Sequence, residues 1–132
     1  LQINVQDSGS FWTLGMEDEG DRWKNLQLII NRFSMVPDPY YAAQWFTCDQ
    51  VGIWNWERFC SEEYDKLHQQ AVSETDPEKR DQMYRKMQDI MEESGAYRFL
   101  THEGSPLMYR NTKVGPATRP DGRPLYRYAD KA

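Results

Sequence analysis

The sequence predicts an α/β fold, because segments with the character of strands alternate along the chain with segments of helical character. Residues 26–33 (LQLIINRF) are mostly apolar and include β-branched side chains, which is typical of a buried strand. Two later stretches, residues 61–71 and 75–95, carry apolar residues at helical spacing, and residues 96–100 (AYRFL) again indicate a strand. We therefore expect a mixed sheet with flanking helices, followed by an extended C-terminal tail.

The first part of the chain predicts one strand and one short helix. Residues 1–7 alternate apolar and polar side chains, which is the period of a strand, and a helical turn is possible around residues 11–16. Two prolines in the VPDP stretch end the apolar run of residues 26–33, because proline cannot continue the hydrogen bonding of a sheet. Residues 40–46 (YYAAQWF) then fit a short helix.

The first amphipathic helix is expected to begin after Ser61. Serine is a favoured N-cap, and Glu62 and Glu63 follow it in the first turn, where acidic residues suit the helix dipole. The residues that follow at helical spacing are Tyr64, Leu67, His68 and Ala71.

The second amphipathic helix is expected to begin at Thr75 or Asp76. Pro77 suits the first turn, and Glu78 can complete a capping box with Thr75. Gly95 is a good stop signal. The apolar stripe of this helix comprises Met83, Tyr84, Met87, Ile90 and Met91. Beyond it, residues 106–110 indicate another short strand, and the sequence from residue 111 is polar and rich in proline and glycine.

Composition restricts the class of protein. A chain of 132 residues predicts one domain, and its 39% hydrophobic content excludes a fully disordered chain. The net charge is −5 with acids and bases interspersed, so we expect no nucleic-acid partner. The apolar runs are too short to span a membrane. The sequence shows no signal peptide and starts abruptly in an expected strand, which suggests a mature piece or a piece of something longer.

Motifs of enzymes are missing from the sequence. It has no GxSxG, no P-loop, no GxGxxG and no HExxH motif. His102 and Glu103 follow a predicted strand, where functional groups often sit, but one such pair is a weak signal for a hydrolase. His68 is better explained by surface or half-buried packing than by catalysis. We therefore expect a protein that is not an enzyme, with no catalytic residue, no metal site and no cofactor.

Both cysteines lie in one short, aromatic-rich segment. Cys48 and Cys60 either form one disulfide or are two unrelated buried thiols, and their spacing to the histidines does not fit a zinc site. Trp54 and Trp56 are two residues apart and share a face in an extended chain, so they either line a ligand pocket or cover a helix. The aromatic residues that bracket the cysteines are Trp45, Phe46, Trp54, Trp56 and Phe59.

Many positions from about residue 25 to residue 110 resemble one known family. That family comprises the peptide-type extracytoplasmic solute-binding proteins, which are the dipeptide, oligopeptide and nickel receptors of ABC importers, often called solute-binding family 5. The matching positions are Asp38-Pro39, Asn55-Trp56-Glu57-Arg58, Tyr64-Asp65 with Leu67, residues 75–80, Tyr84, Gln88, Ile90 and Tyr109-Arg110.

The resemblance has implications for the disulfide, the compartment and the fold. Dipeptide-type members carry a disulfide at the place of Cys48 and Cys60, which implies that these two pair and that the protein is periplasmic. Residues 1–110 are expected to be the C-terminal part of lobe II of a two-lobe, class II-like periplasmic binding protein. Residues 111–132 are then the segment that crosses toward the missing N-terminal lobe I, which explains the apolar residues of the tail.

The resemblance also implies a function and a set of ligand-side residues. A substrate-binding component of an ABC importer takes a peptide or related small solute and delivers it to a membrane permease. In peptide-binding relatives an aspartate pairs with the ligand's α-amino group, and that position here is Met35, while a ligand-enclosing tryptophan is replaced by Arg32. The expected ligand-side residues are Arg32, Phe33, Ser34, Met35, Trp54, Asn55 and Trp56. The alternative is a free-standing protein-interaction module with exposed aromatic residues.

Overall fold

The computed structural model describes residues 5, 7–18, 20–30, 37–100, 117–119 and 123–125. The chain divides into two compact units. The first comprises Leu1–Phe33 with Pro39–Arg98, and the second comprises Ser34–Asp38 with Phe99–Ala132. The predicted boundary at residue 110 stays a prediction.

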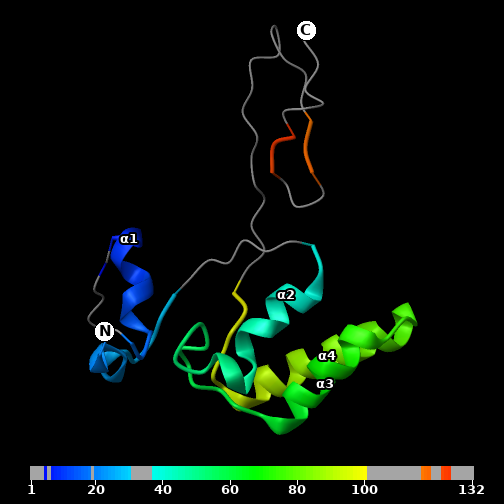
Figure 1. Ribbon diagram of the computed structural model, residues 1–132, viewed down its shortest axis with the longest axis horizontal. Coiled ribbons are helices and arrows are strands. Elements are labelled where there is room, and N and C mark those ends of the chain that lie inside the picture. The colour runs from blue at the N-terminus through cyan, green and yellow to red at the C-terminus, as the bar shows by residue number, and fades with distance from the viewer. Residues whose placement is uncertain are drawn as a thin grey trace, which may run out of the picture. The chain divides into compact units, whose positions relative to one another are not determined.

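Helices and helical turns make up the first unit (Figure 1). Its N-terminal segment holds a four-residue helix and two 3-10 turns, and its larger part holds three short elements and two long helices. The elements in chain order are α1 (Ser8–Phe11), η1 (Trp12–Leu14), η2 (Asp21–Asn25), α2 (Pro39–Ala43), η3 (Gln44–Phe46), η4 (Cys48–Gln50), α3 (Glu62–Ser73) and α4 (Pro77–Ser94).

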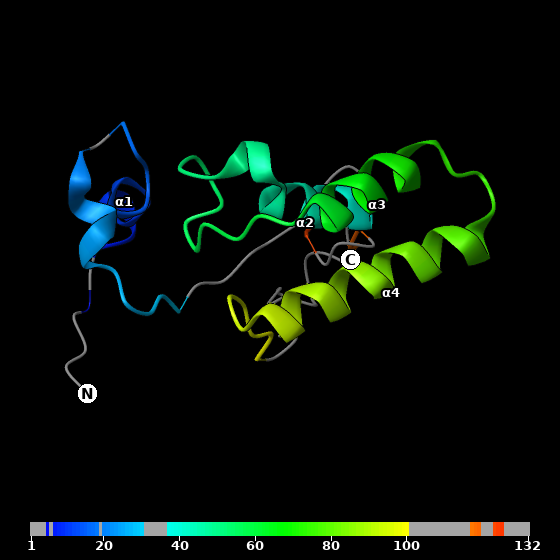
Figure 2. The same ribbon diagram turned by 90° about the horizontal axis from the view of Figure 1, so that it is seen from below.

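The long helices α3 and α4 form a hairpin, and α2 packs against both of them (Figure 2). The prediction of the first helix is confirmed, because Ser61 Oγ accepts a hydrogen bond of 3.3 Å from the Tyr64 N–H. Asp76 caps α4 by accepting from the N–H groups of Glu78 and Lys79, at 2.9 and 3.3 Å. Gly95 ends α4 in the left-handed conformation, with φ of 70°.

The capping box predicted for α4 between Thr75 and Glu78 is not formed. Asp76, not Thr75, occupies the N-cap position. The carboxylate of Glu74 accepts the Asp76 N–H at 2.8 Å, so the acidic partner lies two residues before the N-cap rather than in the first turn. The capping-box motif therefore paired Glu78 with the wrong residue, because the N-cap of α4 is Asp76 and not Thr75.

The core lies where the hairpin meets α2 and η3. Its buried side chains come from the predicted apolar stripes together with Phe46, and each helix contributes one face. The buried members are Phe46, Tyr64, Ala71, Tyr84, Met87 and Met91. Tyr64 is the largest of the fully buried side chains, and its hydroxyl donates a hydrogen bond of 2.9 Å to the carbonyl of Ala43. This bond ties α3 to the end of α2.

The prediction of an α/β fold with a mixed sheet is wrong. Among the described residues only two isolated bridges occur, Val51 with Asn55 and Thr118 with Pro124, and no strand or sheet forms. Residues 26–30 and 96–100 were expected in strands, but Leu28 and Ile30 are 74% and 75% exposed. A short apolar run becomes a strand only when a neighbour completes its hydrogen bonds and covers its side chains, and periodicity does not reveal that neighbour. The strand expected at residues 106–110 lies outside the described residues.

The described residues of the second unit fold back on themselves. Arg119 N–H donates to the Arg123 carbonyl at 2.9 Å, and Leu125 N–H donates to the Ala117 carbonyl at 2.8 Å. The C-terminal region was expected to be extended, and its described residues form an antiparallel bridge between Thr118 and Pro124. Within the described ranges, none of the helices has the length and apolar character needed to cross a membrane.

Candidate functional site

The candidate site is built on the loop that the two cysteines close. Cys48 and Cys60 form a disulfide across a separation of twelve residues, which confirms the pairing implied by the resemblance. We call residues 47–60 the disulfide loop. Three N–H groups, those of Ile53, Trp54 and Asn55, donate to the carbonyl of Gln50 at 3.0, 3.1 and 2.9 Å. The loop is therefore a compact, hydrogen-bonded turn rather than an extended segment.

Asn55 closes the disulfide loop from the inside. Its side chain is fully buried, at 0% exposure. Nδ2 donates to the carbonyls of Thr47 and Phe59 at 3.2 and 2.6 Å, and Oδ1 accepts the Phe59 N–H at 3.1 Å. The amide thus joins the two ends of the loop beside the disulfide. Because its polar atoms are engaged inside the loop, Asn55 is placed as a framework residue, and its predicted contact with a ligand stays a prediction.

The disulfide loop is also fixed to α3. The carboxylate of Asp65 accepts the Cys48 N–H, with distances of 3.1 and 3.3 Å to its two oxygens. Next to it, the Thr47 hydroxyl donates to Asp49, and this hydrogen bond is the main cause that lowers the pKa of Asp49. The start of the loop is therefore held by two carboxylates, one from the loop and one from the helix.

Aromatic rings gather on one side of the disulfide loop, in what we call the aromatic cluster, which comprises Phe11, Trp12, Trp45, Trp54 and Trp56. The ring of Trp12 lies 5.7 Å from that of Trp54 and 5.5 Å from that of Trp56, both edge to face. Trp45 and Trp54 lie 5.0 Å apart. The two tryptophans of the loop therefore do converge, as their spacing suggested, but on an N-terminal ring that the sequence did not identify.

Trp54 and Trp56 differ in what they offer to a ligand. Trp56 is buried, and its Nε1–H donates to the carbonyl of Ile53 at 2.9 Å. Trp54 is 36% exposed, and Ile53 beside it is also exposed. Of the predicted ligand-side residues that the structure describes, Trp54 alone presents a ring to solvent. Arg32, Phe33, Ser34 and Met35 lie outside the described residues, as do His102 and Glu103.

The N-terminal segment packs onto the disulfide loop through a second set of contacts. The Glu17 N–H donates to the Gly52 carbonyl at 2.9 Å, and the Glu17 carboxylate forms an ion pair with Arg58. The guanidinium carbon of Arg58 lies 3.4 Å from the centre of the Trp23 ring, which is a cation–π contact. Arg58 holds this position with a φ of 57°, a left-handed conformation that is uncommon for a residue with a side chain.

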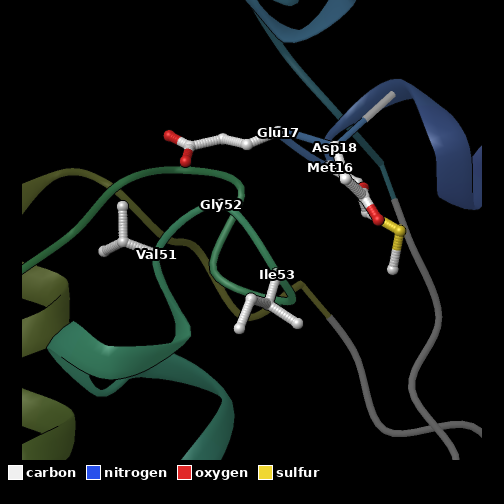
Figure 3. A pocket seen from close by; sticks show the side chains of 6 residues that line it. All are labelled: Met16, Glu17, Asp18, Val51, Gly52 and Ile53. Carbon is white, nitrogen blue, oxygen red and sulfur yellow. The ribbon is translucent and has the colours of Figure 1, made fainter. Parts of the chain in front are cut away.

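A small hollow lies between the N-terminal segment and the disulfide loop (Figure 3). Its volume is about 220 Å³, below the range of roughly 300–1,000 Å³ that is usual for ligand pockets, so it has room for one side chain or a small fragment. Figure 3 shows Glu17 extending toward Gly52 while Asp18 and Met16 lie on the other side. The residues that line it are Met16, Glu17, Asp18, Val51, Gly52 and Ile53. Its wall combines apolar side chains with two carboxylates and carries no nucleophile.

One buried histidine and the arrangement of possible metal ligands bear on what the site can do. His68 was expected at the surface or half-buried, and it is 8% exposed and stacks on Tyr40 with ring centres 5.0 Å apart. Its Nε2 has no hydrogen-bond partner in the described part of the chain. Among the same residues, no group of three histidine, cysteine, aspartate or glutamate side chains is placed to hold a metal ion.

Sequence reasoning missed the part of the site that comes from the N-terminal segment. Trp12, Glu17 and Trp23 are far from residue 50 in sequence, and no motif links them to it. The one available signal was the presence of glycine at positions 15 and 52, because glycine permits close approach of two segments and both residues lie where the segments meet.

Comparison of the chain with protein-family models, with curated proteins and with solved structures finds no match.

Proposed function

We propose that the chain is the substrate-binding component, or a part of it, of an ABC importer for peptides or a related small solute. It catalyses nothing in this proposal, binds a solute in an extracytoplasmic compartment such as the periplasm, and delivers it to a membrane permease. The proposal rests on the motifs that resemble solute-binding family 5 and on the use that the fold makes of them.

The observation that carries the proposal is that the motif residues build the disulfide loop. Asn55, from the Asn-Trp-Glu-Arg motif, closes it by three hydrogen bonds, and Asp65, from the Tyr-Asp-x-Leu motif, accepts the Cys48 N–H. Tyr64 of the same motif is the most deeply packed ring beneath it. These motif residues hold the loop in one conformation. A binding protein benefits from this, because a preorganised loop loses less conformational entropy when a ligand binds.

The ligand contact that we infer for this loop is stacking on Trp54. The ring is partly exposed, supported from behind by Trp45 and Trp12, and therefore fixed in direction. The usual aspartate that anchors a peptide amine is replaced by Met35. Because methionine cannot neutralise an ammonium group, we expect a solute that does not depend on that ion pair.

A solute screen by thermal shift tests the proposal on the full-length gene product. Peptides, opines, sugars and nickel complexes are each added in excess, and binding to the folded state raises the melting temperature. We expect one class to stabilise the protein, and Trp54→Ala to weaken binding roughly 5- to 150-fold in Kd, since stacking on an aromatic ring contributes roughly 1–3 kcal/mol. Tyr41→Ala is the matched control, because Tyr41 is exposed on α2 and is not part of the aromatic cluster. Absence of stabilisation by every class would count against the proposal.

The alternative function is a protein-interaction module. It is favoured by apolar side chains that stand exposed in the first unit, namely Leu28, Ile30, Tyr41, Ile53 and Val72. Light scattering after size-exclusion chromatography separates the two proposals. A stable self-association that Leu28→Ser with Ile30→Ser abolishes supports the module, whereas a monomer that a solute stabilises supports the binding component.

A further inference from the structure

We propose that residues 7–18 and 20–25 form a strap that covers the aromatic side of the disulfide loop and opens as a unit while the helical core stays folded. The strap comprises α1, η1 and η2 with their connections. Its position is set by the disulfide loop and not by the core.

None of the described residues of the strap belongs to the buried core. The core is built by Phe46 and by side chains of α3 and α4, and the partly buried residues that pack around it all lie between Ala43 and Tyr97. The aromatic and apolar side chains of η1 are only half-buried. The helix α1 has four residues, too few to be stable in isolation. The strap therefore depends on its contacts with the disulfide loop for its structure.

Those contacts form one continuous seam. Trp12 meets Trp54 and Trp56 edge to face, and the Glu17 N–H binds the Gly52 carbonyl. At the far end, Arg58 bridges Glu17 and Trp23. The ion pair is partly exposed, with the Glu17 side chain at 58% exposure, so salt and water compete with it. A seam of this kind opens more easily than a buried helix interface.

Two glycines allow the strap and the disulfide loop to pack closely along the seam. A Cβ on Gly15 would lie 2.1 Å from atoms of the Trp56 ring, and a Cβ on Gly52 would lie 2.6 Å from the Glu17 side chain. Gly52 also has a φ of 81°, which glycine adopts without strain. At these two glycines the backbone of one segment packs directly against a side chain of the other. The closed position of the strap is therefore one defined packing arrangement.

The strap covers one side of Trp54, which is the ring that the proposed function places beside the solute, and it also covers the neighbouring Trp56. Trp56 is buried against Gly15 and Trp12, and one edge of Trp54 also meets Trp12. A solute that stacks only on the exposed part of Trp54 can bind while the strap is closed. A solute that reaches Trp56 as well must displace the strap, and its apparent affinity is then reduced in proportion to the fraction of protein with the strap open. This consequence rests on the proposed function, whereas the existence of the strap does not.

Hydrogen exchange at single amides tests the strap. The Glu17 N–H reports on the seam because its hydrogen bond crosses it, and the Met87 N–H, in the middle of α4, reports on the core. In the wild-type protein we expect the Glu17 amide to exchange at least about tenfold faster than the Met87 amide, through an opening that leaves α4 protected. Gly15→Ala forces a methyl group into the Trp56 ring, and we expect it to remove protection at Glu17 while Met87 keeps its own.

Gly9→Ala is the matched control, because it makes the same change in the same strap but meets only the flexible Asp7 carboxylate. Trp12→Ala is a second test that adds no atoms and should also expose Glu17. Equal exchange of Glu17 and Met87 in the wild-type protein, or equal acceleration of both amides in the two test variants, would overturn the strap. The measurement needs no solute, so a failed solute screen leaves it standing, and a failed strap leaves the solute screen unaffected.

Discussion

Asn55 and Phe59 exchange two hydrogen bonds across the disulfide loop, one from Asn55 Nδ2 to the Phe59 carbonyl at 2.6 Å and one from the Phe59 N–H to Asn55 Oδ1 at 3.1 Å. A third bond, from Nδ2 to the Thr47 carbonyl, reaches the other end of the loop. One buried amide therefore performs the same closure as the disulfide by a non-covalent route.

The first prediction concerns that amide. Asn55→Ala leaves buried backbone groups of Thr47 and Phe59 without partners, so we expect a loss of roughly 2–4 kcal/mol in the free energy of unfolding. Urea denaturation followed by circular dichroism measures it. Asn25→Ala is the control, because Asn25 is exposed at the end of η2 and should change stability by less than about 0.5 kcal/mol. A small effect of Asn55→Ala would mean that water replaces the amide.

The second prediction concerns the disulfide. Replacing both cysteines by serine should destabilise the protein by about 3 kcal/mol, because the unfolded chain regains the freedom of the loop. Asn55 still holds the loop ends, so tryptophan emission of the folded double variant should stay close to that of the wild-type protein. A double-mutant cycle between this variant and Asn55→Ala measures the coupling, and additive effects would contradict our view that both close one loop.

The third prediction concerns pH. Burial, and to a lesser degree nearby Glu57, raises the pKa of Tyr97 to about 12, and burial raises the pKa of Tyr64 above its ordinary value of 10.0. A tyrosine with a raised pKa favours the folded state while it is neutral, so this stability is complete below pH 10 and is lost as the pH rises through the folded pKa. Ultraviolet titration of tyrosinate should show two late groups, and Tyr97→Phe and Tyr64→Phe should each remove one. Titration of all tyrosines near pH 10 in the folded protein would contradict this.

The fourth prediction concerns the backbone at Arg58, where φ is 57°. Arg58→Ala and Arg58→Gly both remove the contacts with Glu17 and Trp23, but only glycine adopts this conformation without a steric penalty. We expect Arg58→Gly to be more stable than Arg58→Ala by about 1 kcal/mol, measured by urea denaturation. Equal stability of the two variants would show that the loop relaxes to an ordinary φ once the side chain is shortened.

Local signals in the sequence predicted the helices well. Ser61, Pro77 and Gly95 act through the residues next to them, so the ends of α3 and α4 follow from short-range chemistry. The stripe that includes Tyr84 and Met87 faces the core as its spacing indicated. The short helix after the VPDP stretch is confirmed as α2 followed by η3.

The sheet and half of the candidate site were beyond what local patterns reveal. The LQLII stretch has the composition of a strand, but whether it pairs depends on a partner elsewhere in the chain. In the same way, Trp56 shows no sign in sequence that Gly15 lies against it. The resemblance located the disulfide, whereas the role of Asn55 inside the loop required its hydrogen-bond geometry.

The closure by Asn55 has a consequence for how the covalent bond is made. Its hydrogen bonds join Thr47 and Phe59, which are the neighbours in sequence of Cys48 and Cys60. A chain that has formed the α3–α4 hairpin and folded this turn already holds its thiols side by side before any oxidant acts. Oxidation then acts on a prearranged pair, so we expect the disulfide to form quickly and to fix covalently a loop geometry that the hydrogen bonds of Asn55 already define.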